Sequence, residues 1–298
     1  MSKVLIITIG VERADRSQTL KTFTEGLNAG GDVFGYAVIQ DVLFQITDGV
    51  LSISLDGKEL REVYDTIHLR NHDKYTDYAN AIRVYCDARG MRLVNRADAV
   101  LPYFGKLSQG ALLATNNLPT PNLLTMYGNA ELLEQLIQAN WSYPFVLKHN
   151  EGIRGVDNFL VKDQSQLETV LRAAKPGFIA QPFIKNTGEL RVLTFGYDVP
   201  PLVFRKFAVE GEYLNNTSQG GSSEFIDAAT VQPGMMQDAL AATKLMGREI
   251  GGVDVLLAAD GSHYILEVNS TPAIASGVYL PEKQDLYRTY FTDEQGAQ

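Results

Sequence analysis

The spacing of apolar residues along the chain predicts a series of alternating strands and helices. Val4 to Ile9 is a continuous β-branched and aliphatic run closed by Gly10, which is typical of a central strand covered on both faces. Strand and helix patterns then alternate as far as residue 95, so this first part predicts a small open α/β domain. In order, the patterns predict a helix at 19–27, strands at 34–43 and 63–69, a helix at 78–89 that ends at Gly90, and a strand at 91–95.

The remaining two thirds combine helix and strand patterns with two hairpin signals. Pro119 and Pro121 interrupt regular structure after a first helix. A glycine-containing turn at 151–155 joins two strands, and the Ala-Asp-Gly-Ser turn at 259–262 joins two apolar runs. The patterns predict helices at 106–114, 130–139 and 235–250, strands at 145–149, 159–161, 178–184, 190–195, 201–209, 253–258 and 264–268, and a turn at 185–188.

Composition and charge are those of a folded globular protein and argue against two classes of partner. The 298 residues are 45% hydrophobic and 20% charged, and a chain of this length favours two or three domains. A formal net charge of -9 argues against a surface that holds nucleic acid phosphates. No apolar run approaches the roughly 18 residues of a membrane span, so no membrane partner is expected.

A cytoplasmic location is expected from the single cysteine and from the N-terminus. Cys86 has no partner for a disulfide within the chain, and an unpaired thiol suits a reducing compartment. The apolar run after Lys3 superficially resembles a signal peptide, but it continues directly into Glu12 and Arg13 without a small-residue cleavage site. A first buried strand is therefore the better interpretation of this run.

The second hairpin carries a candidate metal site. Side chains alternate along a strand, so Glu267 and Asn269 project to one side while Val268 packs behind them, and Asp254 can lie opposite on the paired strand. Two carboxylates and an amide oxygen form an all-oxygen site that suits magnesium bound to nucleotide phosphates. The alternative is a surface hairpin whose acids face water. It explains less, because Glu267 and Asn269 are embedded in an apolar strand where an unpaired charge is costly.

Lys148 is a candidate phosphate ligand. It ends the apolar strand at 145–147 and precedes the glycine turn, so a rigid lysine and a mobile cover could hold a phosphate together. Taken alone, a solubilising charge on an edge strand is the more common explanation. The sequence contains neither a GxxxxGK[ST] segment nor a GxGxxG after the first strand, so the two commonest glycine-loop nucleotide motifs are absent.

Taken together, these segments resemble the ATP-grasp ligases, and in particular the RimK-type carboxylate–amine ligases. The similarity covers the C-terminal two thirds, and the agreement in order across many weak motifs is more specific than any one of them. The matching landmarks are Tyr143 to Lys148, the glycine turn, Ala180 to Ile184, Gly188 to Arg191, Glu210 to Tyr213, Asn216, Gly220-Gly221, Gly252 to Asp254, Glu267 to Asn269, and Pro272.

The resemblance implies an α/β ATP-grasp fold preceded by an open α/β domain. It divides the chain into an N-terminal pre-ATP-grasp domain at 1–96, a central phosphate-lid subdomain at 97–184 and a C-terminal catalytic subdomain at 185–298. It also implies a role for each matching residue. Lys106 and Lys148 would grip the nucleotide phosphates under the cover from Gly152 to Gly155; Gln181, Pro182, Phe183 and Ile184 would form the adenine hinge; Glu189 would bind the ribose; and Asp254, Glu267 and Asn269 would hold magnesium.

The implied catalytic residues are Arg191, Lys206 and Asn216. A guanidinium at Arg191 suits two-point contact with the γ-phosphate and the acyl phosphate, and Lys206 or its neighbour Arg205 would assist it. Asn216 would lie in the loop beside the reacting carboxylate. Three positions depart from the family pattern: Pro182 stands where glutamate is frequent, Ala273 where glycine is usual, and Lys206 at an approximate arginine position.

The expected activity is an ATP- and magnesium-dependent ligation of a carboxylate to an amine through an acyl phosphate, with manganese as an alternative ion. The substrates would be an amino acid and a carboxylate of a small molecule, peptide or protein, and a homo-oligomer is compatible with the resemblance. An ATP-grasp small-molecule kinase and a non-catalytic ATP-binding module are the alternatives. The segment His68 to His72 would add polar contacts to the acceptor pocket, unless it is a surface loop.

Overall fold

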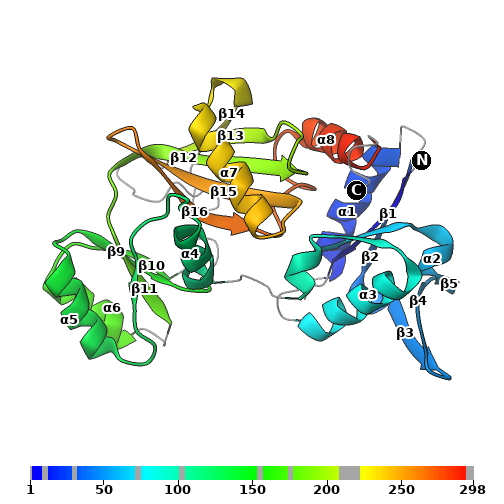
Figure 1. Ribbon diagram of the computed structural model, residues 1–298, viewed down its shortest axis with the longest axis horizontal. Helices are drawn as coiled ribbons and strands as arrows, with labels where there is room; N and C mark the ends of the chain where they lie inside the picture. The colour runs from blue at the N-terminus through cyan, green and yellow to red at the C-terminus, as the bar shows by residue number, and fades with distance from the viewer. Residues whose placement is uncertain are drawn as a thin grey trace.

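The protein consists of strands and helices arranged around four β-sheets (Figure 1). The computed structural model describes residues 2–8, 13–28, 32–70, 75–100, 105–152, 157–173, 177–207 and 222–292. Within these residues, the sheets have the strand orders β2-β1-β6-β7, β3-β4-β5, β10-β9-β11-β8 and β14-β13-β12-β15-β16.

The first sheet is parallel and has the open α/β arrangement expected from the sequence. Its strands are β1 (Lys3–Thr8), β2 (Val33–Val38), β6 (Thr66–Arg70) and β7 (Arg92–Val94), connected through α1 (Arg13–Asn28) and α3 (Thr76–Arg89). Side chains of β1 alternate between two cores, with Val4 and Ile6 in one and Leu5 and Ile7 in the other. A strand buried on both faces explains why its sequence is apolar without interruption.

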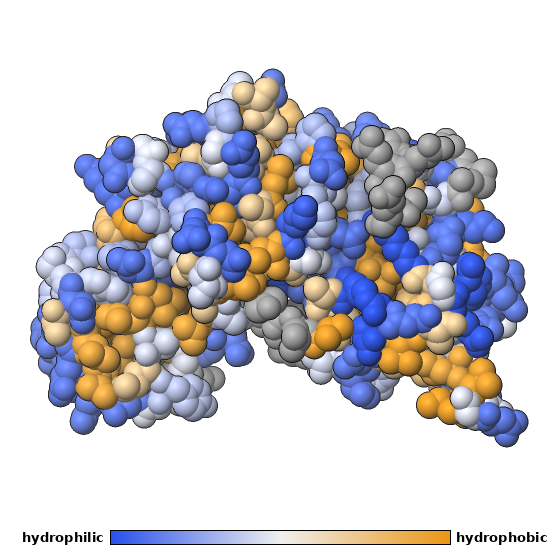
Figure 2. Space-filling model, viewed as in Figure 1, coloured by the Kyte–Doolittle hydropathy of each residue, from blue (hydrophilic) through white to orange (hydrophobic). Residues whose placement is uncertain are grey.

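A small antiparallel sheet is inserted between β2 and β6, where a single strand at 34–43 was expected. That expectation is wrong because a 3-10 helix (Ile39–Asp41) turns the chain after β2 into the hairpin of β3 (Val42–Thr47) and β4 (Val50–Leu55). Short β5 (Lys58–Glu59) and α2 (Leu60–Val63) follow. Apolar residues are exposed along the arm that this hairpin forms at the lower right of Figure 2, although its tip is polar. Ile46 of β3 is 75% exposed.

The central sheet forms the lobe at the left of Figure 1 and is covered by two helices. It contains β8 (Leu124–Thr125), β9 (Phe145–His149), β10 (Asn158–Val161) and β11 (Phe178–Pro182), all antiparallel. The helices α5 (Ala130–Asn140) and α6 (Gln164–Ala173) share an apolar core with this sheet. The hairpin of β9 and β10 confirms the first of the two predicted hairpins.

The fourth sheet is antiparallel and has two different faces. Its strands are β12 (Asn186–Phe195), β13 (Leu202–Phe207), β14 (Ser222–Ile226), β15 (Ile250–Ala258) and β16 (His263–Asn269). A 3-10 helix (Ala228–Thr230) precedes α7 (Pro233–Leu245), which covers one face. On the opposite face, Leu193, Phe195 and Phe204 join the core that contains α8 (Leu280–Thr292) and β1.

Two predicted element boundaries in this sheet are wrong for local reasons. Most of the turn expected at 185–188 is already part of β12, which begins at Asn186 and contains a β-bulge between Asn186 and Glu189. The helix expected at 235–250 ends at Leu245, because Gly247 adopts a positive φ of 64° beside Ala97 and Ile250 begins β15.

Several helices pack against elements of a different expected domain. The domain limits themselves remain a prediction. Helix α4 (Lys106–Thr115) packs on β16, although it belongs to the central segment of the sequence. The C-terminal helix α8 packs on α1, and its Tyr287 makes edge-to-face contacts with Phe23 and Phe195. A 3-10 helix (Arg96–Ala99) connects the first sheet to this region through a buried ion pair of Asp98 with Arg248. In the part of the chain that is described, we find no helix with the length and apolar character needed to cross a membrane.

Candidate active site

Charged side chains occupy one end of the face of the fourth sheet that is not covered by α7. The strand register pairs Arg191 of β12 directly with Asp254 of β15, and Asp254 with Glu267 of β16. Directly opposed residues of antiparallel strands have their side chains on the same face. Glu189 pairs with Lys206 of β13 in the same way. The register therefore brings these side chains, from four neighbouring strands, into one cluster.

Asp254 is the centre of this cluster. Arg191 donates to it with two nitrogens, from Nε to Oδ1 at 2.6 Å and from Nη2 to Oδ2 at 2.7 Å. Lys206 Nζ donates to the same Oδ1 at 2.7 Å and to Glu189 Oε1 at 2.6 Å. Asn269 Nδ2 lies 3.2 Å from Asp254 Oδ2 and 3.2 Å from Glu267 Oε1. A single network of hydrogen bonds thus joins the predicted metal ligands to the predicted catalytic cations.

The network shifts the acidities of its two most buried carboxyl groups in opposite directions. Burial alone would raise the pKa of Asp254, but Arg191 and Lys206 outweigh burial and hold this pKa well below its usual range. Burial raises the pKa of Glu189 to about 8, and the charge of Asp254 adds to the shift, while Lys206 opposes it. Asp254 is therefore the ionised partner of the two cations, and Glu189 holds a proton more readily.

Two β-bulges lie next to the cluster. On β16, Glu267 pairs with Asp254 and Ile265 pairs with Val255, so Leu266 is the extra residue. On β12 the bulge contains Gly188, whose φ is 130° and whose hypothetical Cβ would lie 2.9 Å from the carbonyl oxygen of Lys206. Bulges re-aim the side chains that follow them. Glycine at 188 thus permits the backbone path that delivers Glu189 to Lys206.

Gly252 provides space for the guanidinium of Arg191. A Cβ at position 252 would lie 3.3 Å from Arg191 Nη1 and 2.9 Å from Cβ of Pro272. Any side chain at this position would displace the guanidinium or the loop that follows β16. The sequence includes Gly252 in the matching motif without indicating this role.

Two lysines approach the cluster from outside the fourth sheet. Lys106, the first residue of α4, places Nζ 3.9 Å from Glu267 Oε2 and donates to the carbonyl oxygen of Gly152 at 2.7 Å. Lys148 on β9 is 9% exposed. Burial and the nearby charge of Lys106 lower the pKa of Lys148 to about 8, while Glu267 and Glu189 oppose the shift. The central sheet and the fourth sheet therefore present cations to one common region.

The predicted hinge links these two sheets. Gln181 and Pro182 end β11, and Phe183 and Ile184 continue towards β12. The carbonyl oxygen of Ile184 accepts a hydrogen bond of 3.2 Å from Asn186 Nδ2. Four predicted site residues thus lie consecutively at the crossing between sheets.

Strand alternation distinguishes the two cations that the sequence left open on β13. Lys206 points into the cluster, whereas Arg205 pairs with Leu190, donates to the carbonyl oxygen of Thr187 and lies over the ring of Phe207. Lys206 is therefore the cation that joins Asp254. The predicted site residues Gly155 and Asn216, and with them Glu210 to Tyr213 and Gly220-Gly221, lie outside the described residues.

The loop that follows β16 is held by two side chains, of which the sequence analysis named one only as part of a segment and the other not at all. Arg70, at the end of β6, is 6% exposed and donates to the carbonyl oxygen of Pro272 at 2.6 Å. Lys283 of α8 donates to the carbonyl oxygen of Ser276 at 2.8 Å. His68 and Arg70 are buried strand residues, so the surface-loop alternative for them is wrong, while Asn71 and His72 lie outside the described part of the chain.

The donor set fits a hard divalent cation. Asp254, Glu267 and Asn269 share one face and are joined by the amide of Asn269, so their oxygen-bearing ends can turn towards one ion. No three His, Cys, Asp or Glu side chains cluster as a metal site in the described ranges, and the candidate set has only two such residues and an amide. Nucleotide phosphates would have to complete such a coordination shell.

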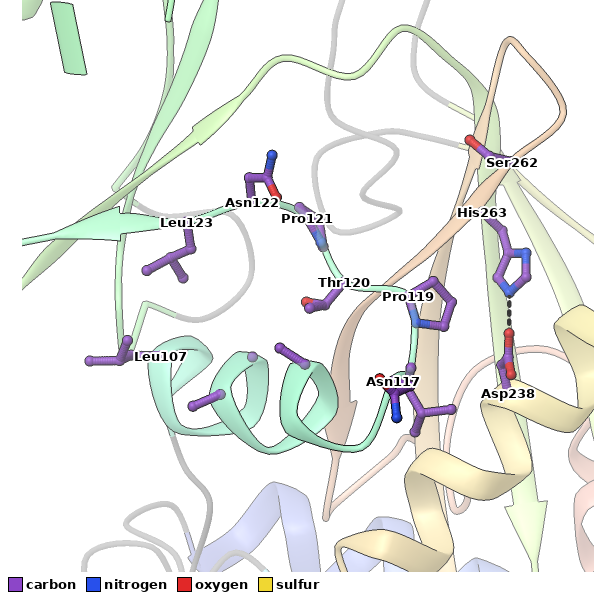
Figure 3. A pocket seen from close by; sticks show the side chains of 14 residues that line it. Leu107, Asn117, Pro119, Thr120, Pro121, Asn122, Leu123, Asp238, Ser262 and His263 are labelled. Carbon is purple, nitrogen blue, oxygen red and sulfur yellow. Dashed lines mark hydrogen bonds and ion pairs between the residues drawn. The ribbon is translucent and has the colours of Figure 1, made fainter. Parts of the chain in front are cut away.

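A cavity of about 860 Å³ lies beside α4 and shares no residue with the cluster. The segment 117–123, α4, α7 and the tip of the β15–β16 hairpin line it (Figure 3). Asp238 of α7 and His263 of β16 point towards each other at its edge and are 2.9 Å apart. The candidate site therefore rests on the charged cluster and not on this cavity.

Comparison with known proteins relates the region that contains the cluster to a single family. Residues 105–279 match the model of the RimK-like ATP-grasp domain. The chain is 30% identical over 242 residues to the probable alpha-L-glutamate ligase 2 of Shewanella amazonensis, and the match covers 78% of each protein. It is 29% identical over 236 residues to the probable alpha-L-glutamate ligase of Parasynechococcus marenigrum; this match covers 77% of the chain but 49% of that relative, so the chain spans about half of its length.

Comparison with solved structures supports the same fold. The ATP-grasp ligase PsnB, complexed with a phosphomimetic variant of its minimal precursor, Mg and ADP, superposes with a TM-score of 0.66. The match covers 95% of the chain and 94% of PsnB at 19% sequence identity. This likeness confirms the expected fold class, an α/β ATP-grasp fold with an N-terminal open α/β domain.

Proposed function

The chain belongs to the RimK-like ATP-grasp family of ADP-forming carboxylate–amine ligases, and we propose that it joins an amino acid to a carboxylate through an acyl phosphate. The observation that carries this proposal is the convergence on Asp254. Arg191 and Lys206 both bind this carboxylate. The amide of Asn269 donates to Asp254 and to Glu267 and so links the three proposed metal ligands. Phosphoryl transfer needs alignment and charge neutralisation above all, and this cluster supplies both.

The nucleotide would lie between the central sheet and the fourth sheet. Lys106 and Lys148 would bind its phosphates, and the contact of Lys106 with the carbonyl of Gly152 supports a phosphate-covering role for the glycine turn. The hinge at 181–184 would bind adenine through backbone groups, where Pro182 offers a carbonyl acceptor but no N–H donor. Glu189 would accept hydrogen bonds from the ribose.

Asp254, Glu267 and Asn269 would hold magnesium. When bound, the ion would supply positive charge that neutralises the nucleotide phosphates. Asp254 already neutralises Arg191 and Lys206, so a further cation at its oxygens would compete with them. Nη1 of Arg191 lies outside the pair with Asp254 and would be the donor to the transferring phosphoryl group.

The reaction would proceed in two transfers. A substrate carboxylate oxygen attacks the γ-phosphorus of ATP, the bond to ADP breaks, and an acyl phosphate forms. An amine then attacks the acyl carbon, phosphate leaves, and the amine proton passes to solvent or to a base. Arg191 would hold the oxygens of the transferred group throughout, and no covalent intermediate on a protein side chain is required.

The substrates are proposed at the level of chemical class. The relatives are named as glutamate ligases, and PsnB was solved with a precursor, so an amino acid as amine and a carboxylate of a small molecule, peptide or protein are the classes to test first. Arg70 and Lys283 hold the loop after β16 beside Arg191, so cationic side chains surround this end of the site.

The test is a screen of amino acids against carboxylate and peptide acceptors for magnesium-dependent release of phosphate from ATP. A condensed product with the combined mass of both reactants minus one water, formed together with ADP, supports the proposal. A phosphorylated small molecule as the final product would instead indicate a kinase. Nucleotide binding without ADP release in any mixture would indicate a non-catalytic ATP-binding module.

A further inference from the structure

The strand that carries two of the proposed metal ligands lies at the edge of its sheet. β16 pairs with β15 on one side, and no described strand pairs with its other side. Outward-facing backbone groups of an edge strand need other partners when they are buried. Val268 lies between Glu267 and Asn269 and is completely buried. Its N–H and its carbonyl are both bound by side chains from outside the sheet.

The first of these side chains is Gln109. Its Oε1 accepts the hydrogen bond from the N–H of Val268 at 2.8 Å, and the residue is 5% exposed. Gln109 lies on α4, one turn after Lys106, whose Nζ is 3.9 Å from Glu267. One rigid helix therefore presents both a proposed phosphate ligand and the acceptor that holds the metal-site strand.

The second side chain is Arg248. Its Nη1 donates to the carbonyl oxygen of Val268, while its Nε donates to Asp98 Oδ1 at 3.0 Å and its Nη2 lies 2.9 Å from the same oxygen. Both members of this ion pair are 1% exposed. Asp98 belongs to the 3-10 helix that follows the first sheet. The ion pair thus fixes the guanidinium in an orientation that leaves Nη1 directed at the strand.

The geometry points to Gln109 and Arg248 as positioning residues that bind the outward-facing N–H and carbonyl of Val268 and thereby set the spacing of Glu267 and Asn269 around the divalent cation. This inference rests on the proposed function, because it takes Glu267 and Asn269 as ligands of that cation. Glu267 and Asn269 are the residues before and after Val268, so a rotation or shift of the Val268 backbone would move their side chains relative to Asp254. The leucine bulge at 266 makes the strand irregular at this point, so β15 alone does not fix its position.

The principal test compares two substitutions at Gln109 in the full-length protein. Gln109→Met keeps the side-chain length but removes the acceptor, and Gln109→Glu keeps an acceptor oxygen. Binding of Mn²⁺ would be measured by electron paramagnetic resonance in the presence of a non-hydrolysable ATP analogue. Loss of a group that orients metal ligands commonly weakens metal binding by about 10-fold or more, so we expect this loss for Gln109→Met and a smaller loss for Gln109→Glu.

A control variant separates positioning from a general loss of stability. Asp238→Ala removes the anchor of the same strand at its other end, where Asp238 binds His263, and leaves the contacts of Val268 intact. We expect Mn²⁺ affinity close to that of the unsubstituted protein. Amide hydrogen exchange over 263–270 gives a metal-free measurement, in which Gln109→Met should exchange faster near Val268.

Arg248→Lys provides a second variant, at the contact with the carbonyl of Val268. It keeps the charge next to Asp98 but cannot serve both Asp98 and the carbonyl of Val268 with the same fork. A weaker Mn²⁺ affinity with nucleotide binding unchanged in the absence of metal is the expected result. If Gln109→Met and Arg248→Lys fold and bind Mn²⁺ as tightly as the unsubstituted protein does, the positioning inference is overturned while the proposed function stands. Absence of nucleotide-dependent Mn²⁺ binding in the unsubstituted protein would overturn both.

Discussion

Arg191 and Asp254 face each other across β12 and β15 and form a two-point ion pair, with donor–acceptor distances of 2.6 and 2.7 Å. A fork of this kind fixes the plane of the guanidinium as well as its position. Nη1 of Arg191 is not part of the fork and lies above Gly252, next to the loop that follows β16. The pairing therefore holds Arg191 in place through Nε and Nη2 and leaves Nη1 outside the fork.

The first prediction concerns the fork itself. Arg191→Lys keeps a positive charge but loses the planar pair of donors, so we expect kcat to fall by about 100-fold while the dissociation constant for ATP changes little. Steady-state phosphate release and calorimetric titration with nucleotide measure the two quantities. Arg205→Lys, on the other face of the neighbouring strand, is the matched control and should retain kcat. An unchanged kcat in Arg191→Lys would remove Arg191 from the proposed mechanism.

A second prediction concerns magnesium. Glu267→Gln preserves the shape of the side chain but removes its charge, so the magnesium concentration for half-maximal phosphate release should rise at least about 10-fold. The comparison is Glu249→Gln, which alters a carboxylate paired with Arg92 away from the cluster and should leave the magnesium dependence unchanged. Equal magnesium curves for the two variants would contradict the assignment of Glu267 as a ligand. Chelation of divalent ions should abolish turnover of the unsubstituted protein.

The third prediction concerns the bulge before Glu189. Gly188→Ala places a methyl group 2.9 Å from the carbonyl oxygen of Lys206 in a backbone with φ of 130°, so it should destabilise the protein by at least about 2 kcal/mol and raise KM for ATP. Gly261→Ala is the control, because φ there is also positive at 89° but no atom lies within 4 Å of the added Cβ. Urea unfolding of both variants isolates the cost of the contact. If Gly188→Ala and Gly261→Ala lose the same free energy of unfolding, the close contact with the Lys206 carbonyl does not destabilise the protein.

The fourth prediction follows from the lowered pKa of Lys148, which is about 8. Nucleotide phosphates favour the charged ammonium, so binding above pH 8 requires the protein to take up a proton. The affinity for a non-hydrolysable ATP analogue should therefore fall as the pH rises from 7 to 9, by roughly 10-fold in total. The pKa of Lys148 is about 8 in the folded protein and 10.5 in the unfolded chain, so the unfolded chain binds more protons between these values. The free energy of unfolding should therefore increase as the pH rises from about 8 to 10.5.

Lys148→Arg tests this origin of the pH dependence, because a guanidinium stays charged over the whole range. Calorimetry in buffers of different ionisation enthalpy should show proton uptake at pH 8 to 9 for the unsubstituted protein, with less uptake for the variant. A slope of affinity against pH that is the same in both proteins would assign the titration to another group. Such a result would leave the phosphate-binding role of Lys148 to be tested by its substitution with methionine.

Local pattern was sufficient for much of the fold and for the centre of the site. The strand β9 and the hairpin of β15 and β16 were predicted because the period of apolar residues is set by strand geometry and short turns. The same period places Glu267 and Asn269 on one face, which the structure confirms. Local pattern also marked Lys148 as a candidate phosphate ligand, and resemblance to a family favoured that role over an edge-strand charge and added Arg191 and Lys106. Their convergence is seen in the structure, and their roles stay predictions.

Only the tertiary structure decided how these pieces meet. Which of Arg205 and Lys206 faces Asp254 depends on the register of β12 against β13, and two bulges alter that regular alternation next to the site. Gln109, Arg248 and Arg70 act on residues that are far away along the chain, on Val268 and Pro272. Periodicity reports which face of an element is buried, but it carries no information on the partner that buries it. That choice is made by packing among segments distant in sequence, and in this protein it determines the surroundings of the charged cluster.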